Sequence, residues 1–514
     1  MKDFAALLER LAFTGARNGK IAHLQHYLQT AQDPDRGWAL AAITGELTLR
    51  NVSPSLLRKL IGERVDPQLF ALSYDFVGDL AETIALLWPE PTTYSDMPLS
   101  QAIAVLQATG RKGTEIAAVL DQLPKDERLA FLKLATGNLR LGMSARLARV
   151  ALSGLGAVEI SQIEEIWHGL TPPYEDLFHW LAGGDLPQNH AKAPFRPVML
   201  STPTTLDELS ARPPERYMAE WKWDGIRVQA VADGDTRRLY SRTGDDISQA
   251  FPDVIEMMDF EGVLDGELLV AHNGEIAAFG ELQRRLGRKT VTRALCEELP
   301  AHLRLYDLLS WQGEDFRPEP LSLRRAKLEN LHLPHAAIDL SPRLDFASWD
   351  DLAALRAAPP SVVIEGVMIK DLNSAYVGGR PRGPWFKWKR DAMRLDAVLL
   401  YAQSGHGKRS GFYSDFTFGL WHDGDLVPVG KAYFGFTDEE LRELDRFVRK
   451  NTTQRFGPVR QVAPELVLEV AFEGVNRSAR HKAGLAMRFP RIARIRWDKP
   501  AAEADHLSAL EALL

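Results

Sequence analysis

The chain has 514 residues, of which 45% are hydrophobic and 25% are charged. This length is too great for a single hydrophobic core and predicts two to four domains of ordinary globular composition. A single cysteine, Cys296, excludes a disulfide framework and suits a reducing compartment. The net charge of −7 argues against a nucleic-acid partner unless the basic residues are clustered along the chain.

Residues 1 to about 190 are predicted to be helical. In the segment FAALLERL, the apolar residues that share one helical face are Phe4, Leu7, Leu8 and Leu11. The same period recurs in SQAIAVLQAT and ERLAFLKLAT, and no apolar run reaches the ~18 residues that a membrane span needs. We therefore expect an all-α domain over 1–190, no membrane span, and a linker in GGDLPQNHAKAPFRP (183–197).

From about residue 215 the apolar period changes from helical spacing to alternation. IRVQAVADGDTRRLYSR alternates apolar and polar residues and turns at Asp233-Gly234, and GVLDGELLVAHNGEIAAF repeats the pattern around Asn273-Gly274. These are the signals of β-hairpins. Helical stretches such as LSLRRAKLENL lie between them, so residues 191–390 are predicted to form a mixed α+β domain.

Short strands dominate again after residue 391. DAVLLYAQ, SDFTFGLW, DLVPVGKAYFG and ELVLEVAFEG are strand-like, and Asp423-Gly424 predicts another hairpin turn. A series of short strands of this kind predicts a small β-barrel over 391–514, with the OB-fold as the leading candidate.

Basic residues cluster in two strips that also contain aromatic residues. RPRGPWFKWKR (380–390) has five Lys or Arg and no acid, and RSARHKAGLAMRFPRIARIRWDK (477–499) has eight Lys or Arg and one Asp. Local strips of this kind allow an acidic chain to bind phosphate groups.

The segment EWKWDGIR places Lys222 between Trp221 and Trp223. A lysine acts as a nucleophile only after it loses its proton, which apolar walls and neighbouring cations favour. A K-x-D-G match arises by chance in roughly one in fifteen chains of this length. The segment alone therefore leaves two alternatives, an exposed lysine on an edge strand and a covalent nucleophile.

Six further segments follow in order: SRTGD, LDGELL, RLYDLL, EGVMIK, WFKWKR and RIRWDK. In this order and spacing, the set resembles the motifs of the covalent nucleotidyltransferases, which are the ATP-dependent DNA ligases, RNA ligases and mRNA capping enzymes. The resemblance to ATP-dependent DNA ligases is close, because PLSLRRAKLENL, VGKAYFGFTDEEL and FPRIARIRWDK also look like ligase segments. The chain carries no appended polymerase, nuclease or phosphopeptide-binding segment, which is typical of a compact bacterial or archaeal ligase.

The resemblance implies that Lys222 attacks the α-phosphate of ATP, expels pyrophosphate and holds AMP as a phosphoramidate. It also implies that the carboxylate of Glu220, or a neighbouring backbone carbonyl, accepts the adenine amino group. Tyr306 matches the aromatic residue that stacks on the base. Taken alone, Tyr306 would equally well fill the core of a strand.

Two glutamates on predicted strands, Glu267 and Glu365, are candidates for binding Mg²⁺, or alternatively Mn²⁺. Both metals take oxygen ligands and suit carboxylates that converge on a triphosphate. Each glutamate lies inside an apolar run, where an unpaired carboxylate is costly, which argues against two surface side chains. By resemblance, Glu267 instead or also binds the ribose.

Further basic residues are implied to contact phosphate groups, although each taken alone would be an ordinary surface charge. Those that neutralise the α-phosphate are Lys387 and Lys389. Those that contact the ribose or the 5′-phosphate of a nick are Arg227 and Arg242. The closing motif contributes Arg496 and Lys499, with Asp498. The resemblance implies that this motif orients pyrophosphate when the barrel moves over the site.

The helical region contains LATGNLRLGMSARL (134–147). Gly137 can end one helix and Ser144 can cap the next, which leaves exposed amides that could hold a DNA phosphate beside Arg140. Similar segments occur in the DNA-binding domain of DNA ligases. The predicted DNA-binding residues are Gly137, Asn138, Arg140 and Ser144, with Arg242. A plain helix–turn–helix joint is the alternative.

The sequence thus predicts an ATP-dependent DNA ligase that seals nicks in duplex DNA during repair or replication. It would act as a monomer whose three domains encircle the DNA, in the cytoplasm and at the nucleoid of a prokaryote. An RNA ligase or a GTP-dependent capping enzyme is the first alternative, but neither needs a helical DNA-binding domain. A non-catalytic nick-binding clamp is the second alternative, and it would not need Lys222, Glu365 and Lys387 together.

Overall fold

A computed structural model describes the chain from residue 1 to residue 514. The residues it leaves undescribed are 48, 50, 51, 92, 110–112, 138, 140, 189, 190, 287, 289, 290, 334, 405–411, 434, 458, 479 and 480. The chain divides into two compact units, Met1–His190 and Ala191–Leu514.

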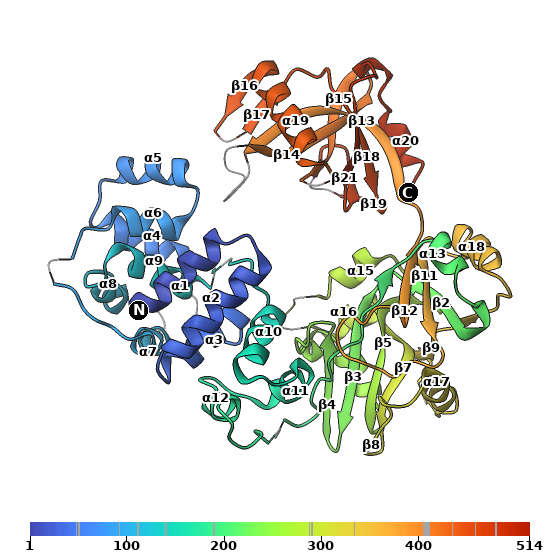
Figure 1. Ribbon diagram of the computed structural model, residues 1–514. Helices are drawn as coiled ribbons and strands as arrows, with labels where there is room; N and C mark the ends of the chain where they lie inside the picture. Colours follow the sequence, from blue (N-terminus) through green and yellow to red (C-terminus); the bar gives the residue numbers. More distant parts are fainter. Residues whose placement is uncertain are drawn as a thin grey trace. The chain divides into compact units, whose positions relative to one another are not determined.

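The described part of the first unit consists of helices and their connections, as the helical periodicity predicts (Figure 1). The residues predicted to share one face of the first helix are all buried. No helix among the described residues is long and apolar enough to cross a membrane. The helices are α1 (Lys2–Phe13), α2 (Arg17–Thr30), α3 (Asp35–Thr44), α4 (Pro54–Gly62), α5 (Pro67–Val77), α6 (Leu80–Leu87), α7 (Leu99–Thr109), α8 (Gly113–Leu120), α9 (Lys125–Thr136), α10 (Ala145–Gly156), α11 (Ile160–Ile166) and α12 (Glu175–Leu181).

The joint between α9 and α10 forms as its sequence predicts. Gly137 ends α9 in the left-handed conformation with φ of 67°, and the Ser144 hydroxyl accepts the backbone N–H of Leu147 at 3.2 Å to begin α10. Lys20 of α2 is buried beneath the joint, and its ammonium donates to the carbonyl of Gly142 at 3.1 Å. The predicted DNA contacts Asn138 and Arg140 lie outside the described residues.

Two sheets form between residues 202 and 389 of the second unit. The first sheet has the order β1-β12-β11-β2-β10, and the second runs β4-β3-β5-β7-β8, with β6 beside β5 and β9 beside β7 (Figure 1). The first sheet comprises β1 (Thr202–Pro203), β2 (Tyr217–Trp223), β10 (Arg343–Leu344), β11 (Ile364–Asp371) and β12 (Trp385–Lys389). The second comprises β3 (Ile226–Asp233), β4 (Thr236–Ser241), β5 (Gly262–His272), β6 (Glu275–Ile276), β7 (Ala301–Trp311), β8 (Glu314–Asp315) and β9 (Ile338–Leu340).

Helices are interspersed with these strands, as the mixed periodicity predicts. They are α13 (Leu206–Ser210), α14 (Pro252–Met257), α15 (Phe279–Gln283), α16 (Arg293–Glu298), α17 (Leu321–Glu329) and α18 (Trp349–Ala357). The predicted turn Asn273-Gly274 forms with positive φ at both residues. The turn predicted at Asp233-Gly234 is shifted by one residue, because Asp233 still pairs with Thr236 and the loop is 234–235.

The chain crosses between the two sheets at two places that matter for the site. It leaves β2 of the first sheet at Trp223 and enters β3 of the second at Ile226, through Asp224 and Gly225. A Cβ atom at Gly225 would lie 2.6 Å from the carbonyl oxygen of Leu268, so only glycine fits this crossover. The chain returns from the second sheet to the first between β9 and β10.

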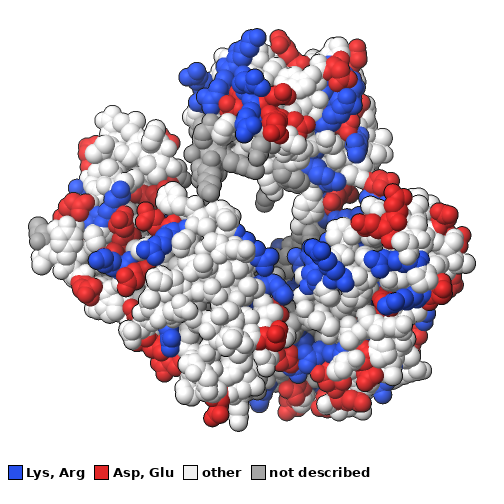
Figure 2. Space-filling model, in the orientation of Figure 1, with Lys and Arg blue, Asp and Glu red and all other residues white. Residues whose placement is uncertain are grey.

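The strands after residue 391 form a third, antiparallel sheet that curls around the long β13 (Met393–Ser404). One edge of β13 pairs with β14, and the other pairs with β18 and then with β17. The remaining elements are β14 (Tyr413–His422), β15 (Asp425–Ala432), α19 (Asp438–Asn451), β16 (Thr452–Phe456), β17 (Val459–Val462), β18 (Val467–Phe472), β21 (Arg491–Arg496) and α20 (Leu507–Glu511), with the hairpin of β19 (Gly474–Arg477) and β20 (Leu485–Arg488). On the face drawn in Figure 2, Lys and Arg gather in local groups among acidic residues.

Candidate active site

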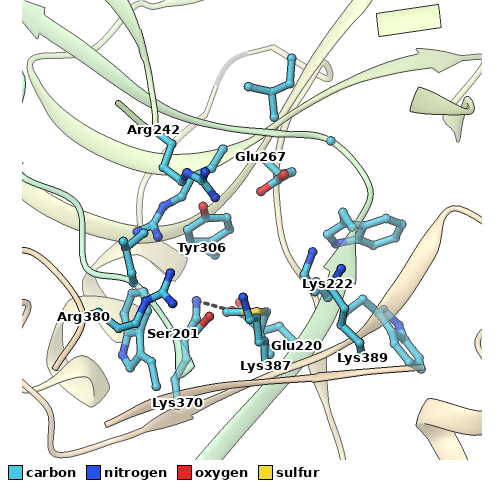
Figure 3. A pocket seen from close by; sticks show the side chains of 18 of the residues that line it. Ser201, Glu220, Lys222, Arg242, Glu267, Tyr306, Lys370, Arg380, Lys387 and Lys389 are labelled. Atoms are coloured by element: carbon cyan, nitrogen blue, oxygen red, sulfur yellow. Dashed lines mark hydrogen bonds and ion pairs between the residues drawn. The ribbon is translucent and has the colours of Figure 1, made fainter. Parts of the chain in front are cut away.

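A cavity of about 480 Å³ opens between the first and second sheets. Strands β2, β11 and β12 supply one wall, and β3, β5 and β7 supply the other. Ten of its side chains are labelled in Figure 3, and most of them are charged. Its size is that of a small-molecule site, and the excess of lysine and arginine favours a polyanionic ligand.

Lys222 points into this cavity from β2 (Figure 3). Its ammonium forms an ion pair with the carboxylate of Glu365, which lies on the neighbouring strand β11. Burial would raise the pKa of Glu365, but Lys222, Lys389 and Arg488 outweigh burial and hold that pKa below its usual value. The side chain is about three-quarters buried and lines the cavity, which differs from the alternative of an exposed lysine.

Three further cations line the cavity without an acidic partner. Among the described residues, Arg242, Arg380 and Lys387 form no ion pair with any carboxylate. Burial lowers the pKa of Lys387, and Arg380, Lys222 and the other nearby cations lower it further. Cations brought together in this way repel one another, so an anion bound among them would be strongly stabilised.

Two residues of this region contact the part of the chain after residue 391. The ammonium of Lys389 lies 2.6 Å from the carboxylate of Glu473, which precedes β19. Asp224, two residues after Lys222, forms a bidentate ion pair with Arg488 of β20. Burial raises the pKa of Asp224 even though Arg488 opposes the shift. Among the described residues, Lys389 therefore has a carboxylate partner, whereas Lys387 has none.

Each oxygen of the Glu220 carboxylate accepts a hydrogen bond from a basic side chain. Arg325 of α17 donates to one oxygen at 2.6 Å, and Lys370 of β11 donates to the other at 2.6 Å (dashed in Figure 3 for Lys370). All three side chains are almost fully buried. Glu220 nevertheless lines the cavity, so both adenine acceptors that the sequence suggests, its carboxylate and a neighbouring backbone carbonyl, stay predictions.

Arg227 lines the cavity, but its guanidinium is directed to protein partners. It forms a bidentate ion pair with the fully buried Asp265 and also donates to the carbonyl of Met199 and to the Tyr376 hydroxyl. The predicted contact of Arg227 with ribose or phosphate stays a prediction, and protein groups hold the guanidinium in this structure. Tyr306 lies within the cavity, as predicted, and the Lys370 ammonium is 4.4 Å from its ring centroid.

Glu267 faces the cavity from β5 of the second sheet, whereas Lys222 faces it from β2 of the first sheet (Figure 3). Burial raises its pKa to about 8, and the attraction of Lys222 and Arg227 only partly opposes this shift. No group of three or more His, Cys, Asp or Glu side chains suited to a metal occurs among the described residues. Glu267 lines the cavity, whereas Glu365 contacts Lys222 but is not among the residues that line the cavity. Mg²⁺ commonly binds only one or two carboxylates together with substrate phosphates, so the predicted metal role of these two glutamates stays a prediction.

The closing-motif residues lie away from the cavity. Arg496 and Lys499 both bind the carboxylate of Asp396 on β13, at 3.1 and 2.8 Å, and Arg496 also binds Asp498. None of them is among the residues that line the cavity. The structure thus places Lys222, Glu220, Glu267, Tyr306, Lys387 and Lys389 around one cavity. It pairs Arg496 and Lys499 of the closing motif with Asp396 of the third sheet.

Sequence reasoning missed three residues of the site. Arg380 lines the cavity, and its position in the basic strip 380–390 was the available signal. Lys370 ends the quoted segment EGVMIK, but no role was predicted for it. Arg325 carries no local signal, since it lies on α17, 105 residues from the Glu220 that it binds.

Comparison with known proteins agrees with this geometry. Residues 198–389 match the family model of the ATP dependent DNA ligase domain, and residues 409–499 match that of the ATP dependent DNA ligase C terminal region. A probable DNA ligase of Koribacter versatilis is 34% identical over 99% of this chain and 96% of its own length. DNA ligase 1 of Korarchaeum cryptofilum is 29% identical over 98% of this chain and 96% of its own length.

A solved structure named Pmar-Lig_Pre shares the fold, with a TM-score of 0.63 and 14% sequence identity over 96% of this chain and 99% of that chain. The relative from Koribacter versatilis covers essentially the whole chain at an identity that does not arise by chance. The two family models fall on the strands that build the cavity and on the curled third sheet. The chain therefore belongs to the ATP-dependent DNA ligases.

Proposed function

We propose that the enzyme seals nicks in duplex DNA through a lysyl-AMP intermediate on Lys222. The observation that supports this most is a lysine set in a cavity with three cations that have no acidic partner among the described residues. The Lys222 ammonium would first lose one proton, and the nitrogen of the neutral amine would then bond to the α-phosphorus of ATP as the bond to pyrophosphate breaks. Loss of a second proton from this nitrogen would leave the neutral phosphoramidate N–H. AMP then passes to the 5′-phosphate of the nick, and the 3′-hydroxyl displaces it.

The unpaired cations would act on the phosphates in this scheme. Lys387 would neutralise the α-phosphate, and Arg242 and Arg380 would hold the nucleotide phosphates or the nick's 5′-phosphate. Tyr306 would stack on adenine, and the acceptor for the adenine amino group would be the Glu220 carboxylate or a neighbouring backbone carbonyl. Arg227 would support the wall behind them through its pair with Asp265.

Glu267 and Glu365 would hold Mg²⁺, or Mn²⁺, together with phosphate oxygens and water. When bound, the ion polarises the phosphate and offsets its negative charge. This assignment requires Glu365 to exchange its contact with Lys222 for the ion. That exchange would also free the lysine for attack.

The other parts of the chain would position the DNA and complete the site. The third sheet, which we assign to an OB-fold barrel over 391–514, would close so that Arg496 and Lys499 leave Asp396 and contact pyrophosphate. The helical domain over 1–190 would bind the duplex, with Gly137, Asn138, Arg140 and Ser144 at a backbone phosphate. The enzyme would act as a cytoplasmic monomer that encircles the DNA.

The experiment is incubation with α-labelled ATP, and separately GTP, in Mg²⁺ without DNA, followed by denaturing electrophoresis. An acid-labile label from ATP alone is expected, and the labelled protein should then seal nicked duplex DNA. A label from GTP would instead indicate the capping class. Absence of a label from protein shown by mass to carry no AMP would contradict the proposal and favour a nick-binding clamp.

The raised pKa of Glu267 predicts a pH dependence of metal-free ATP binding. Because burial raises the pKa to about 8, the side chain is neutral below that pH and repels phosphate only above it. The charge of ATP favours the neutral form further, so affinity is high at pH 7 and falls as pH rises through 8. In EDTA, we expect a loss of about tenfold between pH 7 and pH 9 by calorimetry.

The matched variant is Glu267→Gln, which keeps the neutral shape at every pH. Its metal-free affinity for ATP is expected to change little over the same interval. A parallel decline in both proteins would show that another group causes the pH dependence.

A further inference from the structure

Trp223, the last residue of β2, lies against Arg304 of β7. The guanidinium carbon of Arg304 is 4.3 Å from the centroid of the Trp223 ring, which is the geometry of a cation–π contact. β2 belongs to the first sheet and β7 to the second. The contact therefore bridges the two walls of the cavity directly beside Lys222.

The guanidinium is fixed from its other side by Asp339 of β9. Its Nε and Nη2 atoms donate to the two carboxylate oxygens at 2.9 and 2.6 Å. Arg304 and Asp339 are direct partners in the β7–β9 register. A bidentate pair of this kind sets the plane of the guanidinium, and the Arg304 side chain is only 12% exposed. Arg304 is thus a rigid part of the second sheet.

The Trp223 ring has no polar anchor of its own in the described part of the chain. Its indole nitrogen is buried and has no hydrogen-bond partner there. The ring's position therefore depends on apolar packing within the first sheet's core and on the guanidinium above it. Because Trp223 directly follows Lys222 on β2, a displacement of the backbone that carries the ring also displaces the backbone of the nucleophile.

The reacting groups are divided between the two sheets. Lys222 and Lys387 project from the first sheet, whereas Tyr306 and Glu267 project from the second. A nucleotide stacked on Tyr306 presents its α-phosphate to Lys222 only when the gap between the sheets has the right width. A misplacement of about 1 Å can cost about 10²-fold in rate.

We propose that the Arg304–Trp223 contact sets the width of this gap between the two sheets, and that Arg304 is a positioning residue for adenylation of Lys222. The proposal rests on the proposed function of Lys222. It predicts that Arg304 affects the step in which Lys222 attacks more than it affects ATP binding or the later sealing step, in which Lys222 takes no part.

The experiment is a single-turnover measurement of self-adenylation over a range of ATP concentrations with Arg304→Leu, which keeps bulk and removes the cation. The maximal rate is expected to fall about tenfold or more, and the half-saturating ATP concentration should change less than about threefold. Sealing of a pre-adenylated nick should stay within about threefold of wild type. Arg304→Lys should recover part of the rate, because an ammonium can also lie over the ring.

The matched control is Arg293→Leu, since Arg293 lies in the same part of the chain with a side chain that is 93% exposed. It should adenylate at the wild-type rate. A double-mutant cycle with Trp223→Leu should show strong coupling, with the double variant no slower than the slower single variant.

The proposal is contradicted if Arg304→Leu adenylates like wild type, or if its adenylation and sealing rates fall equally. It is also contradicted if the effects of Arg304→Leu and Trp223→Leu on the adenylation rate are additive. These outcomes leave the proposed function intact as long as wild type is labelled by ATP. Wild-type protein free of AMP that takes no label would overturn both proposals.

Discussion

Lys222→Arg is expected to abolish formation of the protein–AMP adduct while leaving the site's charge unchanged. Arginine keeps the positive charge beside Glu365. Its guanidinium, however, is not deprotonated in proteins and therefore cannot act as the nucleophile. The label from α-labelled ATP should fall by more than about 10⁴-fold. Lys222→Ala should give the same result with the charge removed as well.

Sealing of a nick that already carries AMP distinguishes loss of the nucleophile from loss of the site. Lys222→Arg should retain this activity, because AMP is already on the DNA and no lysyl adduct is needed. Lys327→Arg, which alters an exposed lysine of α17, is the matched control and should label normally. Normal labelling of Lys222→Arg would assign the nucleophile to another residue.

Asp307→Ala is expected to destabilise the second unit strongly. Asp307 on β7 and Arg324 on α17 are both fully buried, and they form two hydrogen bonds of 2.8 and 2.9 Å. Removal of the carboxylate leaves the guanidinium, within the described part of the chain, with the carbonyls of Glu319 and Ser374 as its hydrogen-bond acceptors. The cost is about 3–5 kcal/mol in the free energy of unfolding, measured by urea denaturation.

Two comparisons make this measurement specific. Asp315→Ala removes a carboxylate whose pair with Arg317 is half exposed, and it should cost about 1 kcal/mol or less. The double variant Asp307→Leu with Arg324→Met should recover most of the stability, since it removes both charges together. If Asp307→Ala is no less stable than Asp315→Ala, the buried pair does not hold β7 to α17.

Local patterns in the sequence predicted the helices of the first unit and the alternation of strands after residue 215. The faces of α1 and the turns at Asn273-Gly274 and Asp423-Gly424 form as expected, because each depends on neighbouring residues alone. The motif set also predicted that Lys222, Glu267, Tyr306 and Lys387 lie in one cavity. That information came from family resemblance, since spacing alone does not bring separate strands together.

Contacts between distant segments could not be predicted from the sequence. Glu220 binds Lys370 across 150 residues of chain, and no periodicity links them. Arg227 donates to Asp265 because strand β3, which carries the arginine, pairs with strand β5, which carries the aspartate. Charged residues in a motif therefore reveal that a site exists, but the partner of each charge is decided by strand pairing.

The crossover at Gly225 has a consequence for how the enzyme moves. The two walls of the cavity are covalently joined two residues after the nucleophile, where a side chain larger than hydrogen does not fit. The crossover at Gly225 and the second crossover between β9 and β10 both tie the walls together, so the walls cannot separate freely. At Gly225 the chain itself limits how far the second sheet can move from Lys222, and the Arg304–Trp223 contact lies at this same end of the cavity.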